Sequence, residues 1–297
     1  IYFNMDLCHK YLFDFVDIYP PMNDYLVYKK FLKRKGILPN HLSKNYKSKE
    51  DKLVDKYKVD LKNKNDLSFC EEILKREIEY YDKIEFFKEG DYLLDINDNM
   101  LFMYYDICIN KLPPLSIKND YLSVMNRLKS LTSITNEMIK ILEKGIKEKV
   151  VLNKIIVDSF LKKSQTILDD KINPVNVPRD LKSKFIKDIE KYIIKNIKKL
   201  YLFVINNYLK HCINNLGLCS YKQGKKYYEH ICKYETLSNL TPEIIHDLGL
   251  RHLNNDLNLK SKLAKKLKSD DIDDYVYKNN KFYKNSDEII KDLKSQR

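Results

Sequence analysis

The stretch between Pro178 and Gly217 constrains the fold more strongly than any other part of the chain. Apolar side chains recur there every three or four positions, which is the spacing of one helix face and not of a strand. We therefore predict one long helix from about Arg179 to Asn214. Because the run from Leu200 to Ile205 is apolar on all sides, we expect it to pass through the middle of the fold. The stripe comprises Phe185, Ile189, Tyr192, Ile193, Ile197, Leu200, Val204 and Tyr208.

Proline, glycine and capping patterns divide the remaining chain into shorter helical segments. We expect helices at 6–18, 68–87, 95–112, 120–129, 133–149, 152–169 and 242–267, with a last one opening near Ser286. The polar, lysine-rich stretch from Pro39 to Asn65 receives no helix. Sustained strand-like alternation and long internal repeats are not evident. The prediction is an all-α fold, an irregular multi-helix array with one long central helix and few or no strands.

Pro174 and Pro178 mark the best internal boundary in the sequence. They predict an N-terminal helical region, residues 1–175, and a second region, 176–297, that holds the long central helix and the segment around Thr241. The 43% hydrophobic content can supply a sizeable core. We therefore expect helices on both sides of the prolines to share one core.

The formal net charge of +13 raises the question of a nucleic-acid partner. Six of the 55 basic residues are Arg and the rest are Lys, whereas base and phosphate recognition favours the planar guanidinium fork. The abundance of Lys, Asn, Ile and Tyr is typical of an AT-rich genome. Specific nucleic-acid binding is therefore disfavoured, although it stays an alternative that predicts strongly salt-dependent affinity.

The six cysteines are spread along the chain without a Cys-x-x-Cys pair, which favours reduced thiols in the cytoplasm or another reducing compartment. Cys212, Cys219, His230 and Cys232 do not have the spacing of a common zinc finger, so we expect no metal there. The sequence has no apolar run long enough to span a bilayer, and its start lacks the sections of a secretory signal.

The segment that follows Gly217 carries a clear helix start. Thr241 can accept a hydrogen bond from a free backbone N–H group, and Pro242 stands where a missing N–H costs nothing. Glu243 faces the positive end of the helix dipole. A helix is therefore predicted to begin at Thr241. Gly224 lies ahead of it, and we expect this glycine to let the backbone turn closely before the helix that carries Tyr227 and Tyr228.

Three segments together carry a family resemblance. The first joins Gly-x-x-Tyr-Tyr, formed by Gly224, Tyr227 and Tyr228, to Leu-Thr-Pro-Glu-x-Ile-His-x-Leu-Gly-Leu at 240–250. The second is the helix, glycine, helix segment at 135–163, and the third is the aromatic-rich segment at 277–294. In this order, and over roughly Asp6 to the end, they resemble a large family catalogued as domain of unknown function 885. Its members look like helical zinc metallopeptidases.

The resemblance implies chemistry that this chain lacks. Catalysis in the family is expected from a His-Glu-x-x-His helix, and none of the six histidines here begins that pattern. The chain is therefore interpreted as the non-catalytic N-terminal half of such a protein, with zinc expected only in the missing half. It needs a C-terminal zinc-bearing half or a protein partner, and a homodimer is a further alternative. The competing hypothesis is a stand-alone scaffold or adaptor that has lost peptidase activity.

No catalytic or metal-ligating residue is assigned, but the resemblance offers candidates for lining a peptide cleft. His246, Tyr227 and Tyr228 occupy family positions, and imidazole or phenol groups there could bind a substrate carbonyl. A helix-start histidine bonded to a loop and packing tyrosines are the competing interpretations. His252 lies six residues after His246, so the two cannot share a metal ion. Gly249 is expected to permit a close helix contact.

An acidic cluster on one predicted helix invites comparison with a catalytic carboxylate pair. It comprises Glu71, Glu72, Glu77 and Glu79. Nothing in the sequence indicates burial, which acid–base catalysis would require. We expect these carboxylates to be solvated partners of Lys75 and Lys83, while Ser68 and Glu71 form a capping box.

Overall fold

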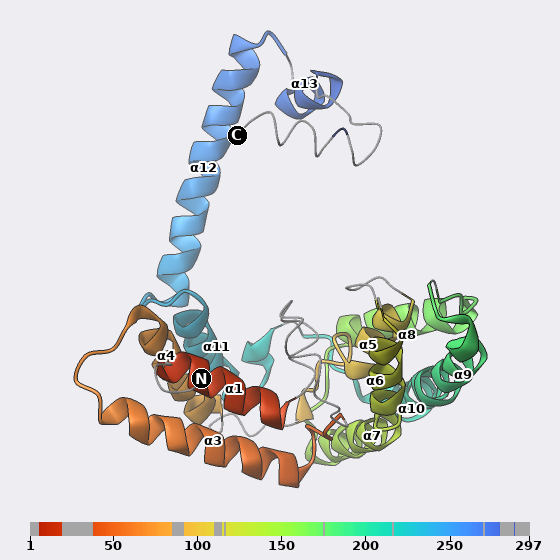
Figure 1. Cartoon of the computed structure of the whole chain (residues 1–297). Coiled ribbons are helices and arrows are strands. Elements are labelled where there is room, and N and C mark those ends of the chain that lie inside the picture. Colours follow the sequence, from red (N-terminus) through yellow and green to blue (C-terminus); the bar gives the residue numbers. More distant parts are fainter. Residues whose placement is uncertain are drawn as a thin grey trace. The chain divides into compact units, whose positions relative to one another are not determined.

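The computed structural model describes residues 6–19, 38–84, 92–109, 115, 117–174, 176–215, 217–269, 271–279 and 288. These residues form helices and no β-strand, apart from an isolated parallel bridge between Asn153 and Ile213, so the predicted all-α class is confirmed (Figure 1). Within them, no helix has the length and apolarity needed to cross a membrane. Within the described ranges before Pro178, the helices are α1 (Leu7–Ile18), α3 (Lys44–Lys62), α4 (Phe69–Ile84), α5 (Met100–Cys108), α6 (Lys118–Leu128), α7 (Leu131–Glu148) and α8 (Lys154–Asp169).

The chain divides into two compact units, residues 1–236 and 237–297. Residue 175, after which the sequence predicts a boundary, lies within the first unit, and apolar packing continues across it. The ring of Tyr121 on α6 meets Phe185 edge-on, with 5.4 Å between ring centroids. The Tyr121 hydroxyl donates to the backbone carbonyls of Leu115 and Asn176 at 3.1 and 3.0 Å. Helices before and after the prolines therefore share one core.

The predicted long helix is present and is continuous from Arg179 to His211. It consists of α9 (Arg179–Ile189), the π turn η2 (Glu190–Ile194), α10 (Lys195–Phe203), the π turn η3 (Val204–Tyr208) and the 3₁₀ turn η4 (Leu209–His211). Its buried side chains are spaced mostly by four residues, which exceeds the 3.6-residue turn of an α-helix, and the wider π turns keep them facing the core. Those that are 0% exposed are Phe185, Ile189, Ile193, Ile197, Leu200, Val204 and Tyr208.

The expectation that 200–205 is buried on all sides is wrong. Leu200 and Val204 face the core, but Leu202 and Ile205 are 44% and 39% exposed. A surface helix can carry isolated apolar side chains on its outer face without a partner. The apolar run therefore marks a helix at the edge of the core, one side of which faces solvent.

A second apolar cluster joins α1, α3 and α4, and α3 is a helix that the sequence analysis did not predict. Four apolar residues of α3 form one buried stripe, Leu53, Val54, Tyr57 and Leu61. Its lysines dominate the composition and mask this stripe in a simple polarity count. The N-cap is Ser43, whose Oγ accepts from Tyr46 N at 3.2 Å. The stripe packs with Leu74 and Ile78 of α4.

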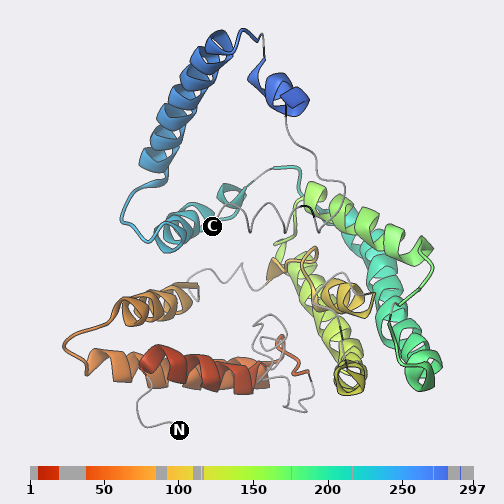
Figure 2. The same ribbon diagram turned by 45° about the horizontal axis from the view of Figure 1, so that its top comes forward.

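Three described helices follow the long helix. Helix α11 (Gly224–Glu235) comes after the 3₁₀ turn η5 (Leu218–Ser220) and belongs to the first unit. The second unit contains α12 (Pro242–Lys266) and α13 (Ile272–Asn279). Helix α12 begins where predicted, since Thr241 Oγ1 accepts from Ile244 N at 3.4 Å and Pro242 is the first helical residue. It is an uninterrupted helix (Figure 2). Helix α13 was not predicted, and the helix expected near Ser286 lies outside the described residues.

Candidate functional site

The Gly-x-x-Tyr-Tyr segment forms the first turn and a half of α11, and its glycine is buried against the preceding turn. A Cβ atom at Gly224 would lie 1.5 Å from the carbonyl oxygen of Leu218 and 2.3 Å from its carbonyl carbon. Those distances are far inside van der Waals contact, and the atoms are backbone atoms that cannot rotate away. Only glycine therefore allows η5 and α11 to approach this closely.

Tyr227 lies on the side of α11 that contacts α4. Its side chain is half-buried and hydrogen-bonds to Tyr80 of α4. Burial, and then this hydrogen bond, raise the pKa of the Tyr80 hydroxyl above its usual value. The hydroxyl of Tyr227 therefore already contacts another phenol of the same unit.

Two further residues complete the contact between α4 and α11. Tyr234 stacks on Tyr80 with ring centroids 4.2 Å apart and ring planes 16° from parallel. The hydroxyl of Tyr234 donates to the carboxylate of Glu77, and burial followed by this contact raises the pKa of Tyr234. An offset or stacked aromatic pair adds roughly 0.5–1.5 kcal/mol beyond its area burial. Sequence reasoning missed this cluster, because its two halves lie far apart in the chain and carry no local pattern.

Tyr228, the next residue, is directed elsewhere. It is 50% exposed, and its hydroxyl pairs with the thiol of Cys232 one turn along α11, which raises the pKa of Tyr228. Adjacent residues on a helix point about 100° apart, so the two tyrosines do not converge on one substrate atom. Of the pair, Tyr228 is the one available to a ligand.

Helix α4 holds a carboxylate that the sequence analysis placed wrongly. Glu71 was expected in solvent beside Lys75 and Lys83, but it is 0% exposed. Both its oxygens accept from Lys64 Nζ at 2.6 Å, and they also accept from the backbone N–H groups of Ser68 and Leu7 at 2.9 and 3.3 Å. The predicted capping box is confirmed, since Ser68 Oγ accepts in return from Glu71 N at 3.3 Å.

The donors around Glu71 explain how a carboxylate stays ionised without solvent. The hydrogen bond from Lys64, followed by that from Ser68, lowers the pKa of Glu71 to about 2 although burial opposes the shift. A general acid needs the reverse, a carboxyl group with a raised pKa. Glu71 is therefore a structural anchor. Of the other three glutamates, Glu77 is half-buried beside Tyr234, whereas Glu72 and Glu79 are exposed as expected; the side chain of Lys83 is outside the described part.

The third cleft candidate belongs to the second unit. His246 lies in the second turn of α12 and is exposed, as is His252. The three candidates are thus distributed over both units, with Tyr227 and Tyr228 in the first and His246 in the second. The close helix contact expected at Gly249 is absent from the described residues, because a Cβ atom there would meet no heavy atom within 4 Å.

Helix α12 carries many apolar side chains and has no buried residue. Leu250, Leu253 and Leu257 follow one another at helical spacing on one side. Leu259 and Leu263 lie on another side together with the half-buried Ile245 and Leu248. The most exposed of the apolar set, at 44–62%, are Ile244, Leu250, Leu253, Leu257, Leu259 and Leu263. Among the described helices, α12 has the most exposed large apolar side chains, and they are divided between two opposite sides of the helix.

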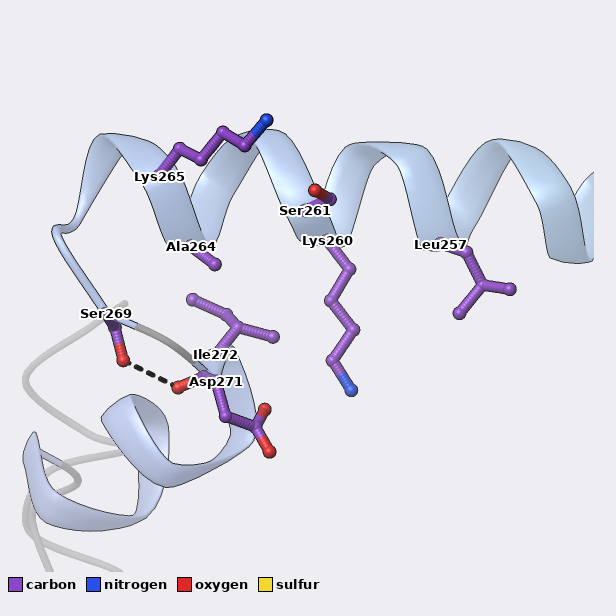
Figure 3. Close-up of a pocket in the computed structure, with 8 residues that line it drawn as sticks. All are labelled: Leu257, Lys260, Ser261, Ala264, Lys265, Ser269, Asp271 and Ile272. Atoms are coloured by element: carbon purple, nitrogen blue, oxygen red, sulfur yellow. Dashed lines mark hydrogen bonds between the residues drawn. The ribbon is translucent and has the colours of Figure 1, made fainter.

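Helix α13 covers only the C-terminal end of this surface. Ile272 is 7% exposed and points toward Ala264, next to an open cavity of about 420 Å³ (Figure 3). Ser269 Oγ donates to the Asp271 carbonyl at 2.7 Å, and Lys260 pairs with Asp273, which raises the pKa of Lys260. The cavity is lined by Leu257, Lys260, Ser261, Ala264, Lys265, Ser269, Asp271 and Ile272.

The zinc site implied by the family resemblance does not fit the residues that are present. Over the described ranges, no group of three or more His, Cys, Asp or Glu side chains could hold a metal ion. His246 and His252 are six positions apart on one helix, which points their imidazoles in different directions. No chemical step through zinc is therefore assigned to these residues.

A family model described as "bacterial protein of unknown function (DUF885)" matches residues 39–296. The chain belongs to this family. The match includes every helix from α3 to α13 and both compact units, whereas α1 precedes it. No curated protein and no solved structure matches the chain.

Proposed function

We propose that the chain is the non-catalytic helical part of a zinc metallopeptidase-like protein, in which it forms one wall of a peptide cleft. Hydrolysis then requires a separate or downstream segment with the His-Glu-x-x-His helix. Membership of the DUF885 family supports the proposal. The observation that carries it is the uncovered apolar surface of α12, which lies in the segment with the strongest family motif.

An isolated amphipathic helix gains little from exposed leucines. Most helix stability in proteins comes from packing an apolar face against a neighbour, and each fully buried Leu or Ile side chain contributes roughly 1.5–3 kcal/mol. Six Leu and Ile side chains of α12 are instead 44–62% exposed, and none of its residues is buried. Exposed apolar side chains gathered in such number on one helix are typical of an interaction surface.

The charges on α12 specify the chemistry of the partner. Lys260, Lys262, Lys265 and Lys266 lie in its last two turns, whereas Glu243 and Asp247 lie in its first two turns. Lysine stems can cover the rim of an apolar contact while their ammonium groups remain in water. The segment that binds α12 is therefore proposed to present an apolar stripe, with carboxylates at the end that meets Lys262, Lys265 and Lys266 and basic groups at the other.

His246 in the second unit and Tyr228 in the first are each, taken separately, candidates for contacting a peptide. Both are exposed, and both can exchange hydrogen bonds with a peptide carbonyl or carboxylate. Tyr227 has a smaller part in this proposal than the resemblance implies, since its hydroxyl is engaged with Tyr80. The chain by itself is proposed to be inactive.

Reconstitution tests the proposal directly. The chain would be mixed with a His-Glu-x-x-His segment from a bacterial DUF885 member, and zinc-dependent hydrolysis of a fluorogenic peptide panel would be measured with and without a chelator. We expect chelator-sensitive hydrolysis from the mixture only. The double variant Leu253→Lys/Leu257→Lys should abolish complex formation, whereas Val59→Lys, at an exposed apolar position of α3, should leave it intact.

Two results would contradict the proposal. Hydrolysis by the chain alone, with zinc added, would show that the chain has its own catalytic site. A complex that forms through α12 without any hydrolysis would favour the alternative, a scaffold or adaptor that has lost the enzyme. In the complex, His246→Ala should raise KM more than it lowers kcat, since a wall residue acts by binding.

A further inference from the structure

The starts of α1 and α4 are held together by Glu71. Its carboxylate accepts the backbone N–H of Leu7 at 3.3 Å, at the first residue of α1, while it caps α4 from within the first turn. Because Glu71 is 0% exposed and is fixed by three donor groups, this junction is well defined. The residues next to Leu7 and Glu71 in the chain are Cys8 and Cys70.

The two thiols of this junction contact each other. Cys8 is half-buried and packs against the apolar cluster of α1, α3 and α4, and its thiol is hydrogen-bonded to that of Cys70, which is exposed. Both are free cysteines. Two cysteines whose side chains already touch need little backbone movement to form a covalent bond.

We propose that Cys8 and Cys70 are an oxidative modification site, at which a peroxide converts the thiol pair into a disulfide that fastens α1 to α4. The site is independent of the proposed peptidase-like function. It lies at the junction of α1, which precedes the family match, with α4, which lies within the match.

The surroundings assign a different role to each cysteine. Burial, then the Cys70 thiol and the carboxylates of Asp6 and Glu71, raise the pKa of Cys8 to about 12, so Cys8 is a thiol at neutral pH. Cys70 is exposed in the first turn of α4, where a peroxide can reach its sulfur directly. Cys70 is therefore the residue that attacks, and Cys8 the residue that resolves.

The reaction balances with the peroxide as the oxidant. The Cys70 thiolate attacks one peroxide oxygen and breaks the O–O bond, which gives a sulfenic acid at Cys70 and, after protonation, water. The sulfur of Cys8 then attacks the sulfenic sulfur, the S–S bond forms, and hydroxide leaves with the Cys8 proton as a second water. Two thiols have lost two electrons and two protons, and the peroxide has been reduced to two waters.

The test uses the full chain. The reduced protein would be treated with hydrogen peroxide, digested without reduction and mapped by mass spectrometry. We expect a peptide pair joined through Cys8 and Cys70 that disappears on addition of dithiothreitol, and a rise of roughly 5–10 °C in the melting temperature of the oxidised protein.

Single variants separate the two roles. In Cys8→Ser, Cys70 should accumulate as a sulfenic acid that dimedone traps, whereas Cys70→Ser should leave Cys8 as an unreacted thiol. Cys219→Ser changes another exposed cysteine and should retain the full yield of the Cys8–Cys70 link. Circular dichroism would verify that each variant is folded. Links that join Cys8 equally to other cysteines, or overoxidation of Cys70 beside a free Cys8 in the unchanged chain, would overturn the proposal.

Discussion

Two long helices of this protein carry apolar side chains at helical spacing but lie in opposite environments. The helix from Arg179 to His211 buries seven apolar side chains at 0% exposure, since α5, α6, α7 and α8 pack against its core-facing side. Helix α12 also carries apolar residues at helical spacing, yet none of its residues is buried. Helical periodicity thus specifies which face needs a partner, and it does not supply that partner.

The difference also separates two sources of helix stability. The long helix depends on tertiary contacts. No side chain caps its N-terminus at Pro178, and its two π turns keep the apolar side chains directed toward the core. Helix α12 depends on local signals: the Thr241 cap, Pro242 at the first position, Glu243 in the first turn and lysines in the last. If this distinction is correct, substitutions in the long helix should change the free energy of unfolding several times more than substitutions in α12.

The largest effect is expected from Phe185→Ala. Phe185 is 0% exposed and contacts Tyr121, so its truncation should lower the free energy of unfolding by about 3–5 kcal/mol. Leu253→Ala on α12 should change it by less than about 0.5 kcal/mol. Urea unfolding followed by circular dichroism measures both. Equal losses would break the comparison, and a loss at Leu253 that depends on protein concentration would show that a second copy covers α12.

Two glycines offer the next test. Gly224→Ala places a methyl group 1.5 Å from a backbone oxygen and should destabilise the first unit by at least about 1–3 kcal/mol. Gly249→Ala meets no atom within 4 Å and should stabilise α12 by roughly 0.5–1 kcal/mol. Thermal unfolding of the two variants should therefore shift in opposite directions. A destabilising Gly249→Ala would mean that another surface packs against this side of α12.

The buried carboxylate of the first unit gives a pH prediction. The pKa of Glu71 is lowered to about 2 in the folded state, so its stabilising contribution is complete above the unfolded value near 4.5 and is lost as the pH falls from there toward 2. Glu71→Gln should cost about 1–3 kcal/mol at neutral pH, and the difference from the unchanged chain should shrink across this acid range. Glu79→Gln, at an exposed position of the same helix, is the matched control. A pH-independent difference would exclude the ionised carboxylate as the cause.

The smallest effect is expected at the N-cap of α12. Thr241→Ala removes the oxygen that accepts from Ile244 N and should cost roughly 0.5–1 kcal/mol. Because the second unit is compact on its own, the change should appear as faster hydrogen exchange in the first turn of α12 and not in α9 or α10. Thr241→Ser retains the acceptor oxygen and should exchange at the original rate. Uniformly faster exchange in both units would show that the cap affects global stability.

Elements specified by local chemistry were predictable. The Thr241 cap, the Ser68–Glu71 capping box, the long helix and the all-α class follow from residues within a few positions of one another. Helix α3 was missed because its lysines hide the stripe that includes Leu53, Val54 and Tyr57. A search for periodicity, independent of mean polarity, would have found it.

Elements of the candidate site that depend on distant residues were not predictable. The capping box was visible in the sequence, but the burial of Glu71 depends on Lys64 and on the start of α1. Tyr80 and Tyr234 meet because α4 and α11 pack together, and neither residue has a distinguishing local pattern among 23 tyrosines. The family motif placed Tyr227 and Tyr228 side by side in the chain, whereas the fold gives them different partners.

The amino-acid sequence alone determined that this protein is helical, where its best-marked helices begin and which of their faces are apolar. Residue spacing, caps and helix breaks carry this information, because those properties arise from backbone geometry within one or two turns. Only the tertiary structure decided which faces are covered, which carboxylate is buried and which thiols meet. Those outcomes depend on side chains that are brought together from distant positions, and the free energy of burial exists only once they have met.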